Sequence, residues 1–272
     1  MMEHVSREWD DLSVRIADLL AAERQRTGDA AEDQSALVKD REMLFSRAAA
    51  LLADAPRQAA PASNISALPP GMGVADDLFV LKSPHSPRVA DLRRVAQTLA
   101  MRWFLGNPKQ PALSIISADR REGRTAVAVN LACIFAQSGV RTLLIDGDLH
   151  NPAIHAKFGL DEPRPGTICR AVQGVDHLAV ITASALLELK SDRFMQSALQ
   201  SVIETMRSEF EVIFVDTPAA ATSNDYQIAG LATAGALCVT REGVTRARRS
   251  SRVLDLCEDA GIAIVGGVML RP

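Results

Sequence analysis

The sequence predicts an α/β fold in which a parallel sheet is flanked by helices. From Pro111 onward, short apolar runs alternate with longer stretches whose apolar residues recur at helical spacing. The apolar runs are nearly uninterrupted, which is typical of strands that are buried on both faces of a sheet. The stretches between them are long enough to carry the helical crossovers that parallel strands require.

The first expected strand is Leu113–Ser117, and a helix at 123–137 follows it and ends before Gly139. The next strand is Arg141–Asp146. Later strands share this apolar character and are expected at Leu178–Thr182, Val212–Asp216, Ala234–Thr240 and Ile262–Met269. Helices at about 193–208 and 245–260 separate the later strands. Ligands of such sheets bind outside the carboxyl ends of the strands, so we expect the functional residues there.

The first part of the chain differs in charge and composition. Residues 1–80 hold eight Lys or Arg and fourteen Asp or Glu, and apolar residues at helical spacing predict helices near Trp9–Leu20 and Lys39–Ala53. From Ala55 the chain is rich in Ala, Pro, Ser and Gly, which is typical of a linker. We therefore expect an acidic helical extension at 1–54, a flexible linker at 55–82 and a sheet domain at 83–272. The extension is either a solvated appendage or an arm that docks on a partner.

Composition excludes several classes of protein. Among the 272 residues, 47% are hydrophobic and 23% are charged, which excludes a mostly disordered chain. A net charge of −3 argues against a protein whose whole surface binds nucleic acid. No apolar run is long enough to cross a bilayer, and the first residues do not resemble a signal peptide. The four cysteines are widely spaced, so we expect reduced thiols in a cytoplasmic protein.

The segment Ser117–Thr125 joins the first strand to the following helix, in the register of the phosphate-binding motif GxxxxGK[ST]. Backbone N–H groups and the helix dipole gather around phosphate oxygens in such a loop. Gly123 and Thr125 match the motif, and the Thr125 hydroxyl is a candidate ligand for Mg²⁺. Ala118 replaces the first glycine, and Arg124 stands where the phosphate-binding lysine is expected.

Three acidic residues end two other strands. Asp146 and Asp148 come at the end of the second strand, and Asp216 ends the strand at 212–216. Carboxylates at the carboxyl ends of parallel strands can hold Mg²⁺, directly or through water, beside a nucleotide. A single strand-end Asp is usually only a solvated side chain, but three such residues in one parallel sheet favour a metal site.

These motifs resemble those of the bacterial tyrosine kinases (BY-kinases). The string from Asp146 to Leu160, with Pro152, His155 and Phe158-Gly159 inside it, resembles the second acidic motif of that family. Asp216-Thr217-Pro218 resembles the family's Walker B motif, and Asp225 resembles an Asp that follows it. The resemblance covers roughly Ser83 to Leu270.

The resemblance implies a P-loop NTPase fold related to MinD and ParA, with ATP and Mg²⁺ as cofactors unless this chain has lost them. It implies a cytoplasmic protein that is peripheral at the inner membrane. Its partner there would be a membrane polysaccharide co-polymerase that sets chain length. The resemblance does not imply binding to a specific nucleic acid. The resemblance implies that Asp148 and Arg124 are the catalytic residues. Residues around the nucleotide would be Glu122, Gly123, Arg124, Thr125 and Ala126. Ligands of the metal would be Thr125, Asp146, Asp148 and Asp216.

Several positions depart from the family pattern. The family's loop reads Pro-Gly-Glu-Gly-Lys-Ser/Thr, whereas this chain has Arg120-Arg121-Glu122-Gly123-Arg124-Thr125. His150 replaces a basic residue after the acidic pair. The family's oligomerisation motif, Glu-x-x-Arg-x-x-Arg, is found as Ala90-x-x-Arg93-x-x-Ala96, so homo-oligomer formation is open. The family also carries a cluster of tyrosines that neighbouring subunits phosphorylate, whereas this sequence has one tyrosine, Tyr226.

Three functional hypotheses follow. The first is a divergent BY-kinase-like protein of exopolysaccharide or capsule synthesis or export, with weak or absent ATPase and tyrosine kinase activity. The second is a non-catalytic pseudokinase module that regulates the same machinery. The third is a positioning ATPase of the MinD/ParA type, supported by the arginines between 246 and 252, because such a helix can contact DNA phosphates or anionic lipid. A solvated helix face is the more common explanation of such a run, and Asp119 stands where the MinD/ParA group has its signature lysine.

Overall fold

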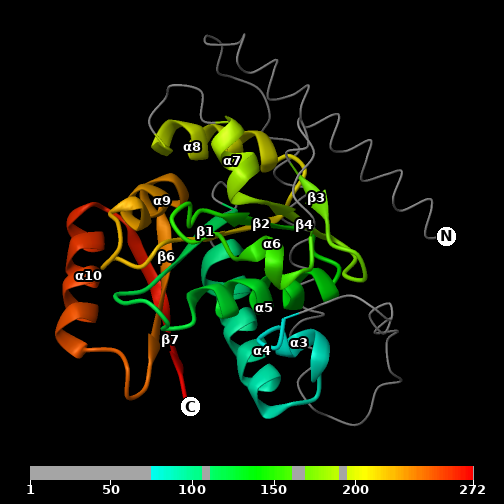
Figure 1. Cartoon of the computed structure of the whole chain (residues 1–272), viewed down its shortest axis with the longest axis horizontal. Helices are drawn as coiled ribbons and strands as arrows, with labels where there is room; N and C mark the ends of the chain where they lie inside the picture. The colour runs from blue at the N-terminus through cyan, green and yellow to red at the C-terminus, as the bar shows by residue number, and fades with distance from the viewer. Residues whose placement is uncertain (1–74, 106–110, 161–168, 190–194, 272) are drawn as a thin grey trace.

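A computed structural model describes residues 75–105, 111–160, 169–189 and 195–271 of the chain (Figure 1). The helices expected near Trp9–Leu20 and Lys39–Ala53, and most of the expected linker, lie outside these residues. Among the described residues, no helix is both long enough and apolar enough to span a bilayer.

The centre of the described part is one sheet of seven strands in the order β3-β4-β2-β5-β1-β6-β7. Neighbouring strands are parallel except for β3 and β4, which pair antiparallel. The strands are β1 (Ala112–Ile116), β2 (Thr142–Asp146), β3 (Arg170–Ala171), β4 (Leu178–Ile181), β5 (Val212–Asp216), β6 (Gly235–Arg241) and β7 (Ala263–Leu270). The predicted α/β class with a parallel sheet is therefore confirmed.

Helices cover both faces of this sheet (Figure 1). One face carries α3 (Phe79–Lys82), α4 (Pro87–Leu99), the π-helix η1 (Ala100–Phe104), α5 (Arg124–Gln137) and α6 (Ile154–Lys157). The other carries α7 (Ala183–Leu189), α8 (Met195–Met206), α9 (Asp225–Thr233) and α10 (Ala247–Asp259). Both faces of β1, β2 and β5 are thus buried, which explains why their sequences are continuously apolar rather than alternating.

Helix α5 is almost entirely buried, and the β1–α5 loop leads into its first residue. Its residues from Val127 to Ala136 are buried. Phe135 meets Phe104 and Phe214 edge-to-face, with ring centroids 5.5 Å apart in both pairs. Such packing fixes the position of the helix, and therefore of the loop between β1 and α5.

The buried core begins before Ser83, the first residue of the expected sheet domain. Leu78 and Val80 are fully buried, and the Val80 N–H donates to the Asn130 side chain of α5 at 2.9 Å. A short apolar run at 78–81 therefore packs on the sheet, although Pro- and Gly-rich sequence lies just before it.

The strands that end in polar residues are neighbours in the sheet, because β5 lies between β2 and β1. The Thr217 hydroxyl donates to the Ile115 carbonyl at 2.7 Å, and the Gly147 N–H donates to the Asp216 carbonyl at 2.9 Å. These bonds hold the ends of β1, β2 and β5 together. The three sequence motifs therefore meet at one edge of the sheet.

Candidate nucleotide-binding site

The loop between β1 and α5 has the turn geometry of a phosphate-binding loop. Gly123 precedes the helix at φ +92°, and no side chain caps the N-terminus of α5. The leading N–H groups of a 14-residue helix therefore point out of its start, where an anion can accept from them. Arg121 also has positive φ, +64°, at the position where the BY-kinase pattern has glycine.

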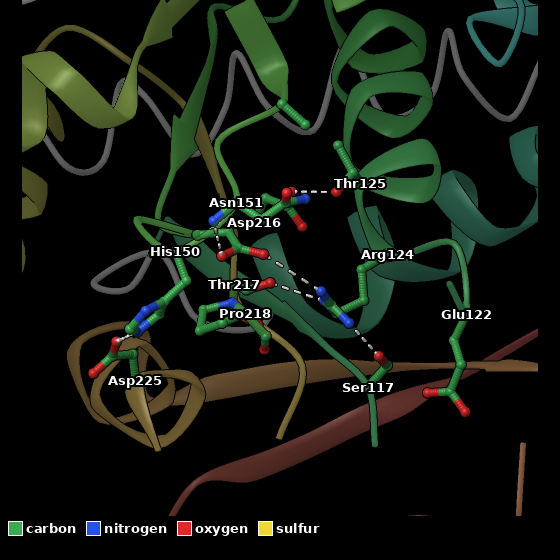
Figure 2. Close-up of polar contacts among 12 residues, drawn as sticks. Ser117, Glu122, Arg124, Thr125, His150, Asn151, Asp216, Thr217, Pro218 and Asp225 are labelled. Carbon is green, nitrogen blue, oxygen red and sulfur yellow. Dashed lines mark hydrogen bonds and ion pairs between the residues drawn. The ribbon is translucent and has the colours of Figure 1, made fainter. Parts of the chain in front are cut away.

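Glu122 is fully buried, and its carboxylate is bonded within the protein. Its Oε2 accepts the N–H of Asp119 at 2.8 Å, and its Oε1 accepts the hydroxyl of Thr245 from the turn before α10. The Asp119 carboxylate in turn pairs with Arg249 of α10 at 2.5 Å. In Figure 2 the Glu122 carboxylate points away from Arg124. The sequence predicts Glu122 beside the nucleotide, and in the structure its side chain joins the loop to the turn before α10.

The guanidinium of Arg124 is buried and makes four contacts with the protein (Figure 2). Its Nε donates to the Thr217 carbonyl at 2.8 Å, and Nη1 donates to the Ser117 hydroxyl at 2.6 Å. Nη1 also lies 3.3 Å from the Asp119 carbonyl, and Nη2 lies 3.7 Å from a carboxylate oxygen of Asp148. The side chain thus connects the loop after β1 with the loops after β5 and β2.

Thr125, Asp146 and Asp216 form a set of oxygen donors suited to a divalent cation. The Thr125 hydroxyl donates to Asp216 Oδ2 at 2.6 Å, and Asp146 Oδ2 accepts the N–H groups of Ala153 and Ile154 at 3.0 and 3.1 Å. The second oxygen of each carboxylate is buried and has no hydrogen-bond partner in the described part of the chain. Buried carboxylate oxygens without a donor are costly, and Mg²⁺ is the ligand that such a set accommodates.

The pKa values of these two carboxyls are raised. Burial raises the pKa of Asp146 to about 6, and burial together with the charge of Asp146 raises that of Asp216 to about 7. The hydrogen bond from Thr125 and the charge of Arg124 oppose the shift at Asp216. A divalent cation would favour the ionised form of both groups.

Asp148 lies beside this set and faces Arg124. One of its oxygens accepts the N–H of Asn151 at 3.0 Å, and the other is the one that pairs with Arg124. Next to it, His150 Nε2 lies 3.0 Å from Asp225 Oδ2, so the histidine in place of the family's basic residue contacts the Asp that follows Walker B. The structure therefore brings Asp146, Asp148, Asp216, Arg124 and Thr125 together.

Two partners of the site were missed by sequence reasoning. Thr245 and Arg249 lie more than 120 residues beyond the loop, and although Arg249 belongs to the arginine run at 246–252, only the packing of α10 reveals their contacts. The Ser117 and Thr217 contacts with Arg124 were also missed, although both residues stand inside the motifs. Of the other predicted residues, Ala126 lies half-buried in the first turn of α5.

The eroded oligomerisation motif lies on α4, away from the site. Ala90 is exposed, Arg93 is half-buried, and Ala96 is fully buried in the core.

The single tyrosine, Tyr226, is also buried, at 2% exposure, between the sheet and α10. Burial raises the pKa of its hydroxyl.

Comparisons with known proteins agree with this geometry. Residues 110–269 match the family model ParA, described as NUBPL iron-transfer P-loop NTPase. Tyrosine-protein kinase YwqD of Bacillus subtilis is 27% identical over 172 residues, which cover 58% of this chain and 71% of that protein. Tyrosine-protein kinase CpsD of Streptococcus pneumoniae serotype 4 is 26% identical, covering 61% of this chain and 78% of that protein. Tyrosine-protein kinase etk of Escherichia coli K12 is 28% identical over 58% of this chain, but the chain spans only 23% of that protein.

Solved structures show the same fold. The kinase domain of Escherichia coli tyrosine kinase ETK superimposes with a TM-score of 0.60 at 22% identity, covering 71% of this chain and 78% of that one. The chimerical protein CapA2B2 gives a TM-score of 0.60 at 21% identity, covering 73% of this chain and 94% of that one. The family match takes in more than half of the chain, including the β1–α5 loop and the acidic strand ends. The chain therefore belongs to the ParA family of P-loop NTPases, and its relatives there include the bacterial tyrosine kinases.

Proposed function

We propose that this chain is a divergent BY-kinase-like protein of exopolysaccharide or capsule synthesis or export. In this role it regulates a membrane co-polymerase from the cytoplasmic side of the inner membrane, and its ATPase and tyrosine kinase activities are weak or absent. Its named relatives are tyrosine-protein kinases, which supports the family part of the proposal.

The contacts of Arg124 carry the proposal of weak activity. In a P-loop the corresponding lysine neutralises phosphate charge in the transition state. Here the guanidinium is already bonded to Thr217, Ser117 and Asp119, and it is paired with Asp148. Moving it toward a phosphate breaks these buried contacts, and leaving it in place removes the charge that catalysis requires.

The remaining residues fit Mg²⁺ and a phosphate group. Thr125, Asp146 and Asp216 would hold the metal, which would screen the charge of the phosphates when bound. The leading N–H groups of α5, beginning next to Gly123 and including Ala126 in the first turn, would donate to the oxygens of a phosphate. Asp148 is placed to take the proton of an attacking hydroxyl, but one of its two oxygens is already paired with Arg124.

The single tyrosine argues against regulation of this protein by tyrosine autophosphorylation. Tyr226 is the one tyrosine of this sequence, and its side chain is buried beneath α10. A buried hydroxyl cannot enter the active site of a neighbouring subunit without local unfolding.

The test is calorimetric titration of the whole chain with ATP and Mg²⁺, together with a phosphate-release assay. We expect weak ATP binding and no turnover above the blank for the natural sequence, and a gain in both for Arg124→Lys. Arg102→Lys, an equivalent change at an exposed position of η1, is the control and should change neither. Tight binding with rapid turnover by the natural sequence would refute the proposal.

Two alternatives are separated by the same measurements. A pseudokinase module is favoured if neither the natural sequence nor Arg124→Lys binds ATP while a membrane co-polymerase still co-purifies. A positioning ATPase of the MinD/ParA type is the other alternative, and it predicts ATP binding and turnover by the natural sequence. Homo-oligomer formation remains a prediction. Light scattering of the purified chain tests it by measuring the molar mass.

A further inference from the structure

Five exposed arginines gather where α10 and β7 lie side by side. They come from the residue before α10, the first half of α10 and the residue after β7, and we call them the arginine face: Arg246, Arg248, Arg249, Arg252 and Arg271. Figure 1 shows that the start of α10 and the end of β7 lie at the same end of the molecule. The whole chain has a net charge of −3, so this concentration of positive charge is local.

The charges on α10 oppose its own dipole. Its first turn contains Arg248 and Arg249 and no acidic residue, and its last turn contains Glu258 and Asp259 and no basic residue. A helix is stabilised by the reverse arrangement, because its N-terminus is already positive and its C-terminus negative. Arg249 has a stabilising partner in Asp119, but Arg248 has no carboxylate partner in the described part of the chain, and an anion bound beside it would relieve the repulsion.

Two of these arginines are paired with a carboxylate, and three are not. Arg249 pairs with Asp119, and Arg271 lies 3.7 Å from Glu242. Arg246, Arg248 and Arg252 form no ion pair with any residue that the structure describes. Their positive charges are therefore not balanced by a carboxylate of the described fold, although Arg252 lies close enough to Tyr226 for its charge to oppose the burial that raises the pKa of that hydroxyl.

Exposed apolar side chains border the arginine face. Val244, in the turn before α10, is 47% exposed, and Met269 of β7 is 65% exposed. Met269 is opposite Thr240 in the β6–β7 pairing, and the Val244 N–H donates to the Arg241 carbonyl. Arginines beside exposed apolar side chains suit the headgroup region of a bilayer, whereas a nucleic-acid backbone makes no use of the apolar ones.

We propose that the arginine face binds the surface of a membrane rich in anionic lipid. This contact is direct and needs neither nucleotide nor a protein partner, so it goes beyond the proposed function. Binding is electrostatic, through Arg246, Arg248 and Arg252, and Val244 and Met269 enter the interface between headgroups and acyl chains.

Co-sedimentation of the whole chain with protein-free vesicles tests the proposal. We expect binding to vesicles of phosphatidylcholine and phosphatidylglycerol, about three to one, that weakens with added salt, and little binding to pure phosphatidylcholine. The triple variant Arg246→Gln/Arg248→Gln/Arg252→Gln should lose about 100-fold in affinity. Its Tm should rise, because repulsion at the start of α10 is removed, and a raised Tm also shows that the variant is folded.

The matched control is Arg88→Gln/Arg94→Gln/Arg102→Gln, which removes the same charge from exposed positions of α4 and η1. It should keep the affinity of the natural sequence. Val244→Ser/Met269→Ser should weaken vesicle binding and leave any binding to duplex DNA unchanged.

Three results would overturn the proposal: no binding to anionic vesicles, equal loss in both arginine triples, or tighter binding to duplex DNA than to anionic vesicles at matched salt. Because the vesicles contain no protein and the assay no ATP, these outcomes do not depend on the function of the nucleotide site.

Discussion

The guanidinium of Arg124 donates from Nε to the main-chain carbonyl of Thr217 at 2.8 Å, which joins the start of α5 directly to the loop after β5. Ser117, Asp119 and Asp148 complete its surroundings. One amino-acid side chain therefore links the loop before α5 to the strand ends that carry the acidic residues.

Replacing Arg124 with lysine should therefore destabilise the chain in the absence of nucleotide. A lysine ammonium cannot reproduce the fork of the guanidinium, so at least one buried acceptor loses its donor. We expect the free energy of unfolding to fall by about 1–3 kcal/mol in urea denaturation. Arg102→Lys should leave it unchanged, and equal stability of the Arg124→Lys variant would show that these contacts do not support the fold.

Arg121→Gly should stabilise the chain. Arg121 has φ +64°, a conformation that costs an L-residue roughly 1 kcal/mol and costs glycine almost nothing. We expect the free energy of unfolding to rise by up to about 1 kcal/mol in chemical denaturation. Arg120→Gly, at the adjacent residue with negative φ, should lower it instead. A loss of stability in both variants would contradict this explanation.

Gly147→Ala should disturb the acidic strand ends. A Cβ atom at Gly147 would lie 2.6 Å from the main-chain carbonyl oxygen of Asp216, and main chain cannot move aside as a flexible side chain does. We expect a loss of about 1–3 kcal/mol in the free energy of unfolding. Gly266→Ala is the control, since the nearest atom to its Cβ is 4.0 Å away. If the two variants were equally stable, the close approach of these loops would be relaxed in solution.

The stability of the nucleotide-free chain should decrease as the pH rises from about 4 to about 7. The pKa values of Asp146 and Asp216 in the folded chain, about 6 and about 7, lie above the value of 3.8 for a free Asp. In this window the folded chain holds protons that the unfolded chain has released, so folding weakens as those protons are lost.

Asp216→Asn should flatten this pH dependence and stabilise the chain by roughly 2 kcal/mol near pH 8. The amide oxygen can still accept the hydrogen bond from Thr125 without carrying a buried charge. Denaturation curves at several pH values measure the effect, and Asp176→Asn, at an exposed position, should keep the natural profile. An unchanged profile in Asp216→Asn would mean that other groups cause the dependence.

Most of the fold could be predicted from the sequence because the central strands are continuously apolar. β2 and β5 end at the predicted residues, and β1, β6 and β7 agree to within one residue at each end. The two-residue strand β3 and the short helix α6 were not predicted, since neither is long enough to show a period. Helix α9 follows the Walker B strand and carries no strong amphipathic pattern.

The acidic part of the site could be predicted because strand ends identify it, whereas the partners of the loop could not. Glu122 and Arg124 stand in motif positions, but the directions of their side chains depend on Thr245 and Thr217, which come from distant segments. A sequence pattern gives the position of a residue in a loop. The partner of its side chain follows only from the packing of the whole domain.

The bond between Glu122 and Thr245 has a thermodynamic consequence. It makes the β1–α5 loop and the turn before α10 a single mechanical unit, although about 120 residues separate them in the chain. Consider a ligand that binds α10 and requires Thr245 to take a different position. Binding of that ligand must then change the affinity of the β1–α5 loop for phosphate. By reciprocity, phosphate in the loop must change the affinity of the helix for that ligand by the same factor.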